Sequence, residues 1–567
     1  VYTYRLEESN TCSAVGTSSE FINCLKYCSS NPNKLCEVSL NTDITFVNDH
    51  IYITGRNESK VDVKIRPANT GFMISKTVSN DDYTPTLELS NSLIYFNNLD
   101  ISGINLNVHD VSKEHAAITI RNTLKIQEGS HNFYNNYSDL SSGGVINSGD
   151  IHFIDTCMSF SNNYSNKGNG GAINTDEVIF KDASITFSNN YSHGAGGAIS
   201  SLKDISFIDS SVTFSGNYSY NIGGAISVAN NISITDASII FSGNYSSNDG
   251  GAIWSGRNII FKDASIIFSD NYSISGDGGA INSVNSTIVK DSSIIFSGNH
   301  SYYYGGAISS YKDTNIIDSS ITFSMNHSIS GDGGAIYSYT GDISFIDSSI
   351  TFRDNYSYAG DGGAILHNNG EMIFAGGLYE FYNNNLLDLS KHGSAIGGDK
   401  ILIDNSSQKT TLHFIDNSGK STIWINNFDT SLACSEPNVT ISGCNNIYNF
   451  THNLVNTGIF SFKDNLFMAG GSWDFSNNTY GNKKSTTALY GNNIATSKIH
   501  LRYADFSFDN TLVTVNATPD VSNIGKIKGT SATQEEKYYD YNIFLTSEFN
   551  GHAAIEISTN RYNPLPP

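Results

Sequence analysis

Residues 184–199 read SITFSNNYSHGAGGAI, residues 211–226 read SVTFSGNYSYNIGGAI, and residues 238–253 read SIIFSGNYSSNDGGAI. Each segment starts 27 residues after the one before it, so the pattern has a fixed period. A period of this length is typical of repeat proteins, in which one small unit of secondary structure stacks on the next. The length of 567 residues alone would indicate several globular domains, but the repeat is the stronger evidence and indicates one repeat architecture instead.

Three markers carry this period through the middle of the chain. Gly-Gly-Ala-Ile, or a degenerate copy of it, starts at residues 143, 170, 196, 223, 250, 278, 305, 333, 362 and 393. Phe-x-x-Asn follows nearly the same step from Phe133 to Asn384, and an aspartate recurs from Asp155 to Asp347. Because three markers hold one phase over more than 200 residues, the repeat is not a chance similarity.

The residues within one repeat favour strands over helices. From Gly196 to Ile222 no apolar residues recur at helical spacing, and short runs at 198–200, 205–207 and 212–214 are bounded by turn-forming residues. Three strands and three turns per coil describe a triangular solenoid with equivalent strands about 4.8 Å apart. A propeller blade needs about 40–50 residues, and a leucine-rich repeat needs a leucine framework. The sequence predicts an all-β fold, a right-handed parallel β-helix of about 27 residues per coil with capped ends.

The regularity of the repeat divides the chain into three predicted parts. Residues 1–130 are expected to form an N-terminal cap and irregular β coils with a disulfide cluster, and residues 131–396 the regular repeats. Residues 397–567 are expected to form irregular C-terminal coils and a cap. An open end of a β-helix is an exposed strand edge, so both ends need a cover.

The composition narrows the classes of function. The formal net charge is −22 and the pI is near 4.9, which argues against nucleic acid as a partner. Aromatic residues make up 12% of the chain, which argues against disorder. No run of about 18 apolar residues occurs, so no transmembrane segment is expected in this chain.

Seven cysteines indicate an oxidising compartment, because four fall within the first 36 residues and two more lie ten residues apart. We expect disulfides among Cys12, Cys24, Cys28 and Cys36, and between Cys434 and Cys444. Zinc binding by the first four is a weaker alternative, since paired C-x₂-C spacings are absent. Cys157 is left over and is expected to be a free thiol in the core.

Tandem Gly-Gly-Ala-Ile and Phe-x-x-Asn tetrapeptides resemble the passenger domains of the chlamydial polymorphic membrane proteins. The resemblance covers roughly residues 130–390, under half of the chain, and rests on two fairly specific motifs in alternation. It implies a β-helical extracellular passenger involved in adhesion to cells. This chain departs from the family pattern in two ways. Its repeat is more uniform, and each Phe-x-x-Asn from Asn136 to Asn355 is extended so that the asparagine begins an Asn-x-Ser.

The asparagines of this column allow two interpretations, which exclude each other at any one site. As sequons on a surface turn they would carry glycans, whereas as inward residues they would form a ladder of amides bonded from coil to coil. The column is Asn136, Asn163, Asn190, Asn217, Asn244, Asn271, Asn299, Asn326 and Asn355. Scattered candidate glycosylation sites are Asn57, Asn231, Asn285, Asn405, Asn438, Asn449, Asn477 and Asn516.

Two further columns accompany the asparagines. A tyrosine or histidine follows each of them, from Tyr137 to Tyr356, and this row either stacks on itself or offers a surface to a sugar. The recurring aspartate is expected to form a turn, with calcium bridging between neighbouring aspartates as the alternative. Apart from calcium, no cofactor is expected.

Strand alternation predicts a small apolar stripe on the outside of the coils. If Phe241 faces inward, its neighbour Ile240 faces outward, and so do Ile267 and Ile295, whereas other coils hold Thr or Ser at this position. Strand propensity alone would also explain these isoleucines. The alternative is a candidate contact stripe that meets a partner.

These observations predict a non-enzymatic, extracellular or cell-surface protein that serves as an adhesin or a rigid structural shaft. A self-assembling subunit of an extracellular glycosylated filament is the alternative. A polysaccharide-degrading β-helix enzyme is the weaker one, because the central coils keep a constant loop length and no catalytic constellation stands out. The expected partners are other copies of the chain, or a receptor or glycan on a host or neighbouring cell.

Overall fold

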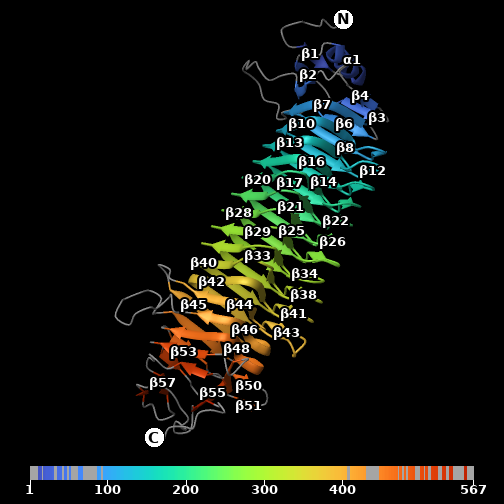
Figure 1. Ribbon diagram of the computed structural model, residues 1–567. Helices are drawn as coiled ribbons and strands as arrows, with labels where there is room; N and C mark the ends of the chain where they lie inside the picture. Colours follow the sequence, from blue (N-terminus) through green and yellow to red (C-terminus); the bar gives the residue numbers. More distant parts are fainter. Residues whose placement is uncertain are drawn as a thin grey trace. The chain divides into compact units, whose positions relative to one another are not determined.

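The computed structural model divides the chain into two compact units, residues 1–266 and residues 267–567, and each unit is mainly a stack of parallel strands, with two short antiparallel pairs in unit 2 (Figure 1). The structure describes residues 10–15, 17–30, 35–40, 44–47, 50–52, 62–67, 86–90, 93–404, 409–429, 446–451, 453–469, 472–475, 478–480, 483–484, 486–491, 498–502, 505–507, 512–516, 518–520, 527–530, 536–539 and 554–557. Within these ranges the predicted all-β parallel solenoid is confirmed.

The first residues of unit 1 form short strands around one helix. The elements are β1 (Asn10–Val15), α1 (Ser18–Ser30), β2 (Leu35–Leu40), β3 (Ile44–Val47), β4 (His50–Tyr52), β5 (Asp62–Pro67), β6 (Thr86–Ser90), β7 (Leu93–Ser102), β8 (Asn105–His109), β9 (Ser112–Lys113) and β10 (Ile118–Gln127). β1 pairs with β2, and β2 with β5, in parallel. Parallel coils therefore already precede residue 131, where the regular repeat begins.

Helix α1 was not predicted, although the sequence contains a signal for it. Thr17 caps its N-terminus, because the backbone N–H of Glu20 donates to Oγ1 of Thr17 at 3.2 Å. A threonine followed three residues later by glutamate is the capping-box pattern. Phe21 and Cys24 are buried, so the helix covers apolar surface beside the first strands.

The regular coils of unit 1 from residue 184 onward each contain four short strands, one more than predicted, whereas the two coils before them contain three. The phenylalanine strands are β11 (Ser130–Tyr134), β14 (Cys157–Ser161), β17 (Ser184–Ser188), β21 (Ser211–Ser215) and β25 (Ser238–Ser242). The additional two-residue strands are β12 (Tyr137–Ser138), β15 (Tyr164–Ser165), β18 (Tyr191–Ser192), β22 (Tyr218–Ser219) and β26 (Tyr245–Ser246). The remaining strands are β13 (Ile146–Ile154), β16 (Ile173–Lys181), β19 (Ile199–Ser201), β20 (Ile205–Ile208), β23 (Ile226–Val228), β24 (Ile232–Thr235), β27 (Ile253–Ser255) and β28 (Ile259–Lys262).

The parallel register of unit 1 places like residues on like residues. Phe187 pairs with Phe214, and Phe214 with Phe241, so one coil is 27 residues long here. The rings of these phenylalanines are buried and stack with centroids 4.8 and 4.9 Å apart. Ile185, beside Phe187 on the same strand, is buried as well. The predicted inward face of these strands is confirmed.

Unit 2 repeats the same coil with more variation in strand length. β29 (Ser265–Ser269) is the strand at the boundary of the units. The following strands are β30 (Tyr272–Ser273), β31 (Ile281–Ser283), β32 (Thr287–Lys290), β33 (Ser293–Ser297), β34 (His300–Ser301), β35 (Ile308–Ser310), β36 (Thr314–Ile317), β37 (Ser320–Ser324), β38 (His327–Ser328), β39 (Ile336–Ser338), β40 (Ile343–Arg353), β41 (Tyr356–Ser357), β42 (Ile365–Tyr382) and β43 (Asn385–Leu386). Phe268, Phe296, Phe323 and Phe352 stack at 4.8 Å and are fully buried.

The parallel coils of unit 2 continue past residue 396, where the regular motifs end. Strand β44 (Ile396–Ile403) pairs in parallel with β46 (Ser418–Asp429), and β45 (Thr410–Ile415) with β47 (Ile447–Thr451). The later strands are β48 (Leu454–Ala469), β49 (Ser472–Asp474), β50 (Thr479–Tyr480), β51 (Lys483–Lys484), β52 (Thr486–Gly491), β53 (Lys498–Arg502), β54 (Asp505–Ser507), β55 (Leu512–Asn516), β56 (Thr518–Asp520), β57 (Ile527–Thr530), β58 (Glu536–Tyr539) and β59 (Ala554–Ile557). Loss of the motifs therefore changes the loops and not the stacking.

The second glycine of each Gly-Gly pair is needed where neighbouring coils approach closely. A Cβ on Gly197 would overlap the carbonyl oxygen of Gly224, and a Cβ on Gly334 that of Gly363. The first glycine, as at Gly196 with φ +69°, adopts the left-handed conformation that side chains disfavour. The Gly-Gly-Ala-Ile marker is therefore a packing requirement of the corner it forms.

Candidate functional site

In unit 1, each regular coil has one asparagine that faces the interior and bonds to the asparagine of a neighbouring coil. Nδ2 of Asn163 donates to Oδ1 of Asn190 at 2.9 Å and to the carbonyl oxygen of Phe133 at 3.0 Å. Its Oδ1 accepts from the backbone N–H and from Nδ2 of Asn136, at 3.2 and 2.9 Å. All the bonding capacity of the amide is thus used. The members of this asparagine ladder in unit 1 are Asn136, Asn163, Asn190, Asn217 and Asn244, each at most 1% exposed.

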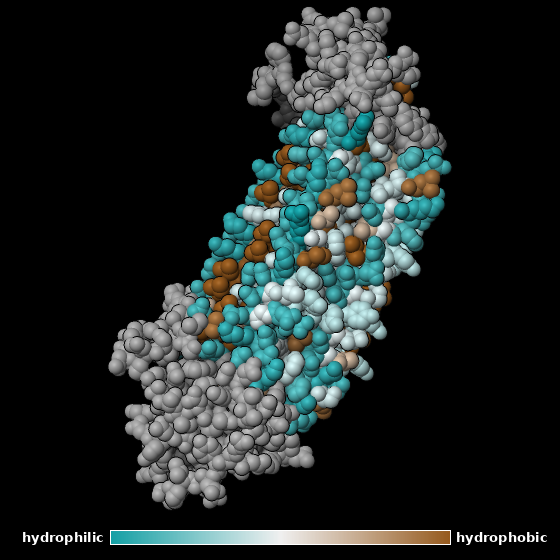
Figure 2. All heavy atoms as spheres, in the orientation of Figure 1, coloured by the Kyte–Doolittle hydropathy of each residue, from teal (hydrophilic) through white to brown (hydrophobic). Residues whose placement is uncertain are grey.

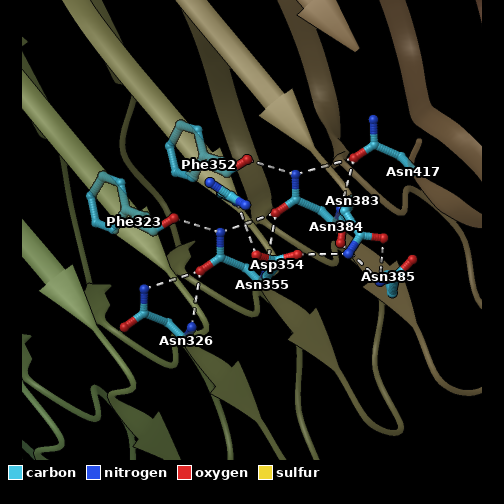
Figure 3. Close-up of polar contacts among 10 residues, drawn as sticks. Phe323, Asn326, Phe352, Asp354, Asn355, Asn383, Asn384, Asn385 and Asn417 are labelled. Atoms are coloured by element: carbon cyan, nitrogen blue, oxygen red, sulfur yellow. Dashed lines mark hydrogen bonds and ion pairs between the residues drawn. The ribbon is translucent and has the colours of Figure 1, made fainter. Parts of the chain in front are cut away.

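Unit 2 holds an asparagine ladder with the same geometry (Figure 3). Nδ2 of Asn355 donates to Oδ1 of Asn384 at 3.0 Å and to the carbonyl oxygen of Phe323 at 2.9 Å. Figure 3 shows the labelled ladder amides aligned from Asn326 to Asn417, each directed at the next. The buried members in unit 2 are Asn271, Asn299, Asn326, Asn355, Asn384, Asn417, Asn453 and Asn478.

The last four members of the ladder lie outside the candidate column, which stops at Asn355. Asn384, Asn417, Asn453 and Asn478 keep the amide-to-amide bonds although none of them is followed by x-Ser or x-Thr. Phe-x-x-Asn precedes all four, so that tetrapeptide was the signal that could have found them. The ladder therefore depends on the asparagine and not on the sequon.

The serine of each Asn-x-Ser also faces inward. Oγ of Ser192 donates to the carbonyl oxygen of Gly168 at 2.9 Å, and Oγ of Ser219 to that of Gly194 at 2.8 Å. The serines of the column, from Ser138 to Ser357, are fully buried. With the amide nitrogen and the serine both enclosed, the column in this fold has no room for glycans, and the ladder geometry accounts for both residues.

The scattered sequons are less enclosed. Asn231, Asn285 and Asn449 are half-buried, and Nδ2 of Asn231 donates to Oδ1 of Asp204 at 3.1 Å. Asn57, Asn405, Asn438 and Asn477 lie outside the described residues, as does the side chain of Asn516. Glycosylation at all eight of these positions stays a prediction.

The cysteines are described only in part. Cys24 is buried in α1 and disulfide-bonded, whereas the side chains of Cys12, Cys28 and Cys36 lie outside the described residues, as do Cys434 and Cys444. The predicted pairings therefore stay predictions. Cys157 is free but exposed, so its expected place in the core is wrong. It pairs in register with a serine at the outward first position of β17, which explains its exposure.

The aromatic row beside the ladder stacks on itself in both units. In unit 1 the rings of Tyr137 and Tyr164 lie 5.1 Å apart and nearly parallel. In unit 2 His300 stacks on His327 at 4.8 Å, and His327 on Tyr356 at 4.6 Å. Burial lowers the pKa of His300 to about 4, with a further contribution from His327. The row therefore stiffens its turn, and its histidines are kept neutral at pH 7.

The recurring aspartate forms a turn in the left-handed conformation. Asp182 and Asp209 in unit 1 have φ of +52° and +48°, and Asp291 and Asp318 in unit 2 have +50° and +49°. Aspartate and asparagine tolerate this conformation better than most residues. Among the described residues, no three His, Cys, Asp or Glu side chains gather as a metal site. The calcium alternative gains no support, and turn geometry is a sufficient reason for the aspartates.

The candidate contact stripe faces outward. Ile240 in unit 1 is 39% exposed, and Ile267 and Ile295 in unit 2 are 37% and 42% exposed. Ile267 and Ile295 follow the buried Ile266 and Ile294 along the chain and precede the stacked Phe268 and Phe296, so alternation along the strand sets their direction. Figure 2 shows small groups of hydrophobic residues on a mainly hydrophilic surface. The stripe is thus a surface feature, as predicted from the alternation.

Unit 2 also carries a run of tyrosine rings that sequence analysis missed. Ring centroids lie 4.9 Å apart for Tyr302 and Tyr303, 6.3 Å for Tyr303 and Tyr304, and 4.4 Å for Tyr304 and Tyr337. The run continues from Tyr337 to Tyr339 at 6.4 Å, and from Tyr339 to Tyr311 at 5.0 Å. We call these six residues the tyrosine chain. The triplet Tyr302-Tyr303-Tyr304 was its signal in the sequence.

Comparison with known proteins identifies the repeat itself. No helix among the described residues is long and apolar enough to cross a membrane. The model of the Chlamydia polymorphic membrane protein repeat matches residues 184–202, 211–229, 238–256 and 293–311. No curated protein and no solved structure matched the chain. In sequence and in its parallel β-solenoid fold, this chain thus carries repeats of the Chlamydia polymorphic membrane protein family in four places and is similar to the β-helical passenger domains built from them.

Proposed function

We propose that this chain is a non-enzymatic adhesin of the cell surface, in which the coils form a rigid support for exposed contact residues. The four matched repeats and the solenoid fold fit a surface-exposed repeat protein, and the matched family is not an enzyme family. The observation that supports the adhesin role most directly is the division between inward and outward positions. The inward amides and rings bond to and stack on the chain itself, whereas the isoleucines of the stripe are exposed.

Rigidity follows from the inner contacts of each unit. Asn190 joins three coils, because its amide bonds to the next asparagine and to the phenylalanine carbonyl of the previous coil. A fully satisfied polar network of this kind fixes one arrangement of the chain. Phenylalanine rings stacked at about 4.8 Å add apolar contact to each step. Such a body holds its outward residues at constant spacing, which suits repeated weak contacts with another surface.

The contact stripe supplies the test of the adhesin role. Ile240, Ile267 and Ile295 are changed together to Thr, the residue that other coils hold at this position. We expect unchanged far-UV circular dichroism and thermal midpoint, and weaker binding of beads coated with the full chain to cells. A matched control changes Ile208, Ile317 and Ile346 to Thr on a different strand of the coil. Equal adhesion of the wild type and both variants would contradict a contact role for the stripe.

Lateral assembly into a filament is the second candidate function, and the same exposed isoleucines favour it. Contiguous exposed apolar residues usually have a partner, and a second copy of the chain is one such partner. Sedimentation of the wild type and of the triple isoleucine variant separates the two roles. Concentration-dependent assembly that the variant loses, together with unchanged cell binding, would favour the filament over the adhesin.

An extracellular location is part of the proposal, and the cysteines give it a chemical test. We expect mass spectrometry of unreduced peptides to find Cys434 bonded to Cys444, and Cys12, Cys24, Cys28 and Cys36 bonded among themselves. Disulfides of this kind persist in oxidising compartments. Cys157, which is exposed and free, serves as the internal control for thiol labelling. Labelling of all four N-terminal cysteines in the native protein would contradict the location.

A further inference from the structure

We infer that the tyrosine chain of unit 2 and the aspartates beside it form a docking surface for a cationic segment of a partner protein, one that presents arginine or lysine. This inference rests on the proposed surface role and names the chemistry of one partner. It involves a different surface from the isoleucine stripe. The proposed role of the isoleucine stripe and this inference can therefore fail independently of each other.

The tyrosine chain offers aromatic faces to the solvent. Tyr302, Tyr303, Tyr311 and Tyr339 are 38%, 44%, 51% and 42% exposed. Tyr337 is only 4% exposed and lies under the ring of Tyr304, so the exposed rings stand on a packed base. Tyrosine gives a large contact area for a small loss of side-chain freedom, and it is enriched in the centres of protein interfaces.

Carboxylates lie beside the middle of the tyrosine chain and beside one end of it. In the middle, Oδ1 of Asp277 accepts from the backbone N–H of Tyr304 at 3.2 Å. The carbonyl oxygen of Asp332 accepts from the backbone N–H of Gly305, the residue after Tyr304, at 3.0 Å. Burial, and then the charges of Asp332 and Asp277, raise the pKa of Tyr304. At the Tyr311 end, Asp313 follows Tyr311 by two residues, and its Oδ1 accepts from the backbone N–H of Asp342 at 3.0 Å.

The segment of sequence that carries the tyrosine chain is acidic. Residues 270–347 contain eight aspartates, two lysines, and no glutamate or arginine, so their formal charge is 2 − 8 = −6. Lys312, beside Tyr311, is one of the two lysines and is counted in this sum. Burial raises the pKa of Asp332 against the opposing effect of the hydrogen bond from Asp361. A cation placed there would favour the charged form of this carboxyl group.

These two features together select the occupant. Guanidinium and ammonium groups bind to the faces of aromatic rings and to carboxylates, and this surface presents both within two neighbouring coils. Anionic partners such as nucleic acid would be repelled. A neutral glycan would use the rings but gain little from the excess of negative charge. A basic polypeptide segment is the partner that uses every part of the surface.

The test titrates the full chain with three probes. The first is a synthetic peptide of alternating Arg and Gly, the second its counterpart of alternating Glu and Gly, and the third a linear neutral glucose oligosaccharide. We expect binding of the arginine peptide alone, with slower amide hydrogen exchange confined to peptides around residues 302–311 and 337–342. Binding without protection there means non-specific attraction to an acidic protein and overturns the inference.

Matched variants separate the tyrosine chain from general charge. Changing Tyr303, Tyr311 and Tyr339 together to Ala is expected to weaken binding of the arginine peptide by about ten-fold or more, because three aromatic faces are lost. The control changes Tyr134, Tyr220 and Tyr245 to Ala, three exposed tyrosines of unit 1, and is expected to change the affinity less than about two-fold. Equal effects of the two variants would overturn the inference.

A second pair of variants tests the carboxylates. Changing Asp313 and Asp332 together to Asn removes charge beside Tyr311 and beside Tyr304, and we expect weaker binding of the arginine peptide. Changing Asp182 and Asp209 of unit 1 to Asn removes the same charge elsewhere, at turns whose left-handed conformation asparagine tolerates. Selective binding of the glucose oligosaccharide, lost in the tyrosine variant and kept in the aspartate variant, would assign the surface to glycans instead.

Discussion

The ladder of unit 1 and the end of the ladder of unit 2 differ in sequence spacing but not in geometry. From Asn136 to Asn244 the asparagines are 27 residues apart, whereas the steps from Asn355 to Asn478 are 29, 33, 36 and 25 residues. The amide-to-amide distances are 2.9–3.0 Å in the first set and 3.0–3.1 Å in the second. The extra residues lie in loops, and the entropy cost of closing a loop rises only slowly with its length. The inner contacts therefore set the register, and the repeat length follows from them.

Removing one core ring gives the largest expected effect. Phe214→Ala in the 27-residue region and Phe414→Ala in the long coils should each cost about 3–5 kcal/mol of local stability, because both rings are buried in the same stack. Native-state hydrogen exchange of the coil that carries the change measures this cost. A cost below about 1 kcal/mol at Phe414 alone would mean that the long coils are not held by their core.

Removing one ladder amide should cost somewhat less. Asn217→Ala and Asn417→Ala each leave buried partners without a bond, among them the carbonyl oxygens of Phe187 and Phe381, and we expect a loss of about 2–4 kcal/mol. Asn132→Ala, at an exposed position of β11, is the control and should stay within about 0.5 kcal/mol. A large difference between the two ladder variants would show that loop length does affect the register.

Acid is expected to weaken unit 2 more than unit 1. Burial lowers the pKa of His300, His327, His367 and His392 in unit 2, whereas His131 is the described histidine of unit 1 with this shift. For His300, with a pKa of about 4 against an ordinary 6.5, the unfolded chain binds a proton between these values while the folded chain does not. Stability is therefore full above pH 6.5 and falls as the pH drops towards 4.

For His300 the size of this acid effect is about 1 kcal/mol, after allowance for solvent screening. Amide hydrogen exchange at pH 7 and pH 5, corrected for the intrinsic rates, measures it in each unit. His300→Tyr with His327→Tyr places the residue of other coils at these positions and should reduce the loss in unit 2. If unit 1 opened at a higher pH than unit 2, the acid effect could not be assigned to the buried histidines of unit 2.

The smallest expected effect concerns one turn before the ladder asparagine. Met325 of unit 2 has φ +55°, whereas Asn189 of unit 1 holds the equivalent turn with φ +52°. Met325→Asn should stabilise the protein by about 0.5–1 kcal/mol, and Asn189→Met should destabilise it by a similar amount, since asparagine tolerates this conformation better. Thermal midpoints of the two single variants measure the effect. A change of the same sign in both would rule out backbone strain as its cause.

The features that recur with the coil could be predicted from the sequence. Phe187 and Phe214 carry period-2 alternation and the 27-residue step, so their burial and stacking follow from the pattern. The asparagine column could be found in the same way. Whether that column forms a ladder or carries glycans could not be predicted from the sequence. A sequon and a ladder use the same residues, and only the burial of the side chains distinguishes the two.

Features that occur once were missed for a different reason. Helix α1 lies outside the repeat, so Thr17 and Glu20 had no second copy to draw attention to them. Tyr304 and Tyr337 are separated by more than one coil in sequence and meet only because register places neighbouring coils in contact. The exposure of Cys157 follows from alternation along β14, because Met158 and Phe160 face inward and Cys157 takes an outward position.

The asparagine ladder also has a direction. In unit 1, Nδ2 of Asn163 and of Asn190 each donates to Oδ1 of the asparagine in the next coil, so these amide dipoles are aligned and strengthen one another. The first amide of the ladder in unit 1 and the last described one in unit 2 have other partners: Oδ1 of Asn136 accepts from the backbone N–H of Val111, and Nδ2 of Asn478 donates to the carbonyl oxygen of Phe475, three residues away. A coil duplicated or deleted in frame inherits this polarity, and no amide is left without a partner. The number of coils can therefore change in evolution by simple recombination, in steps of about 4.8 Å.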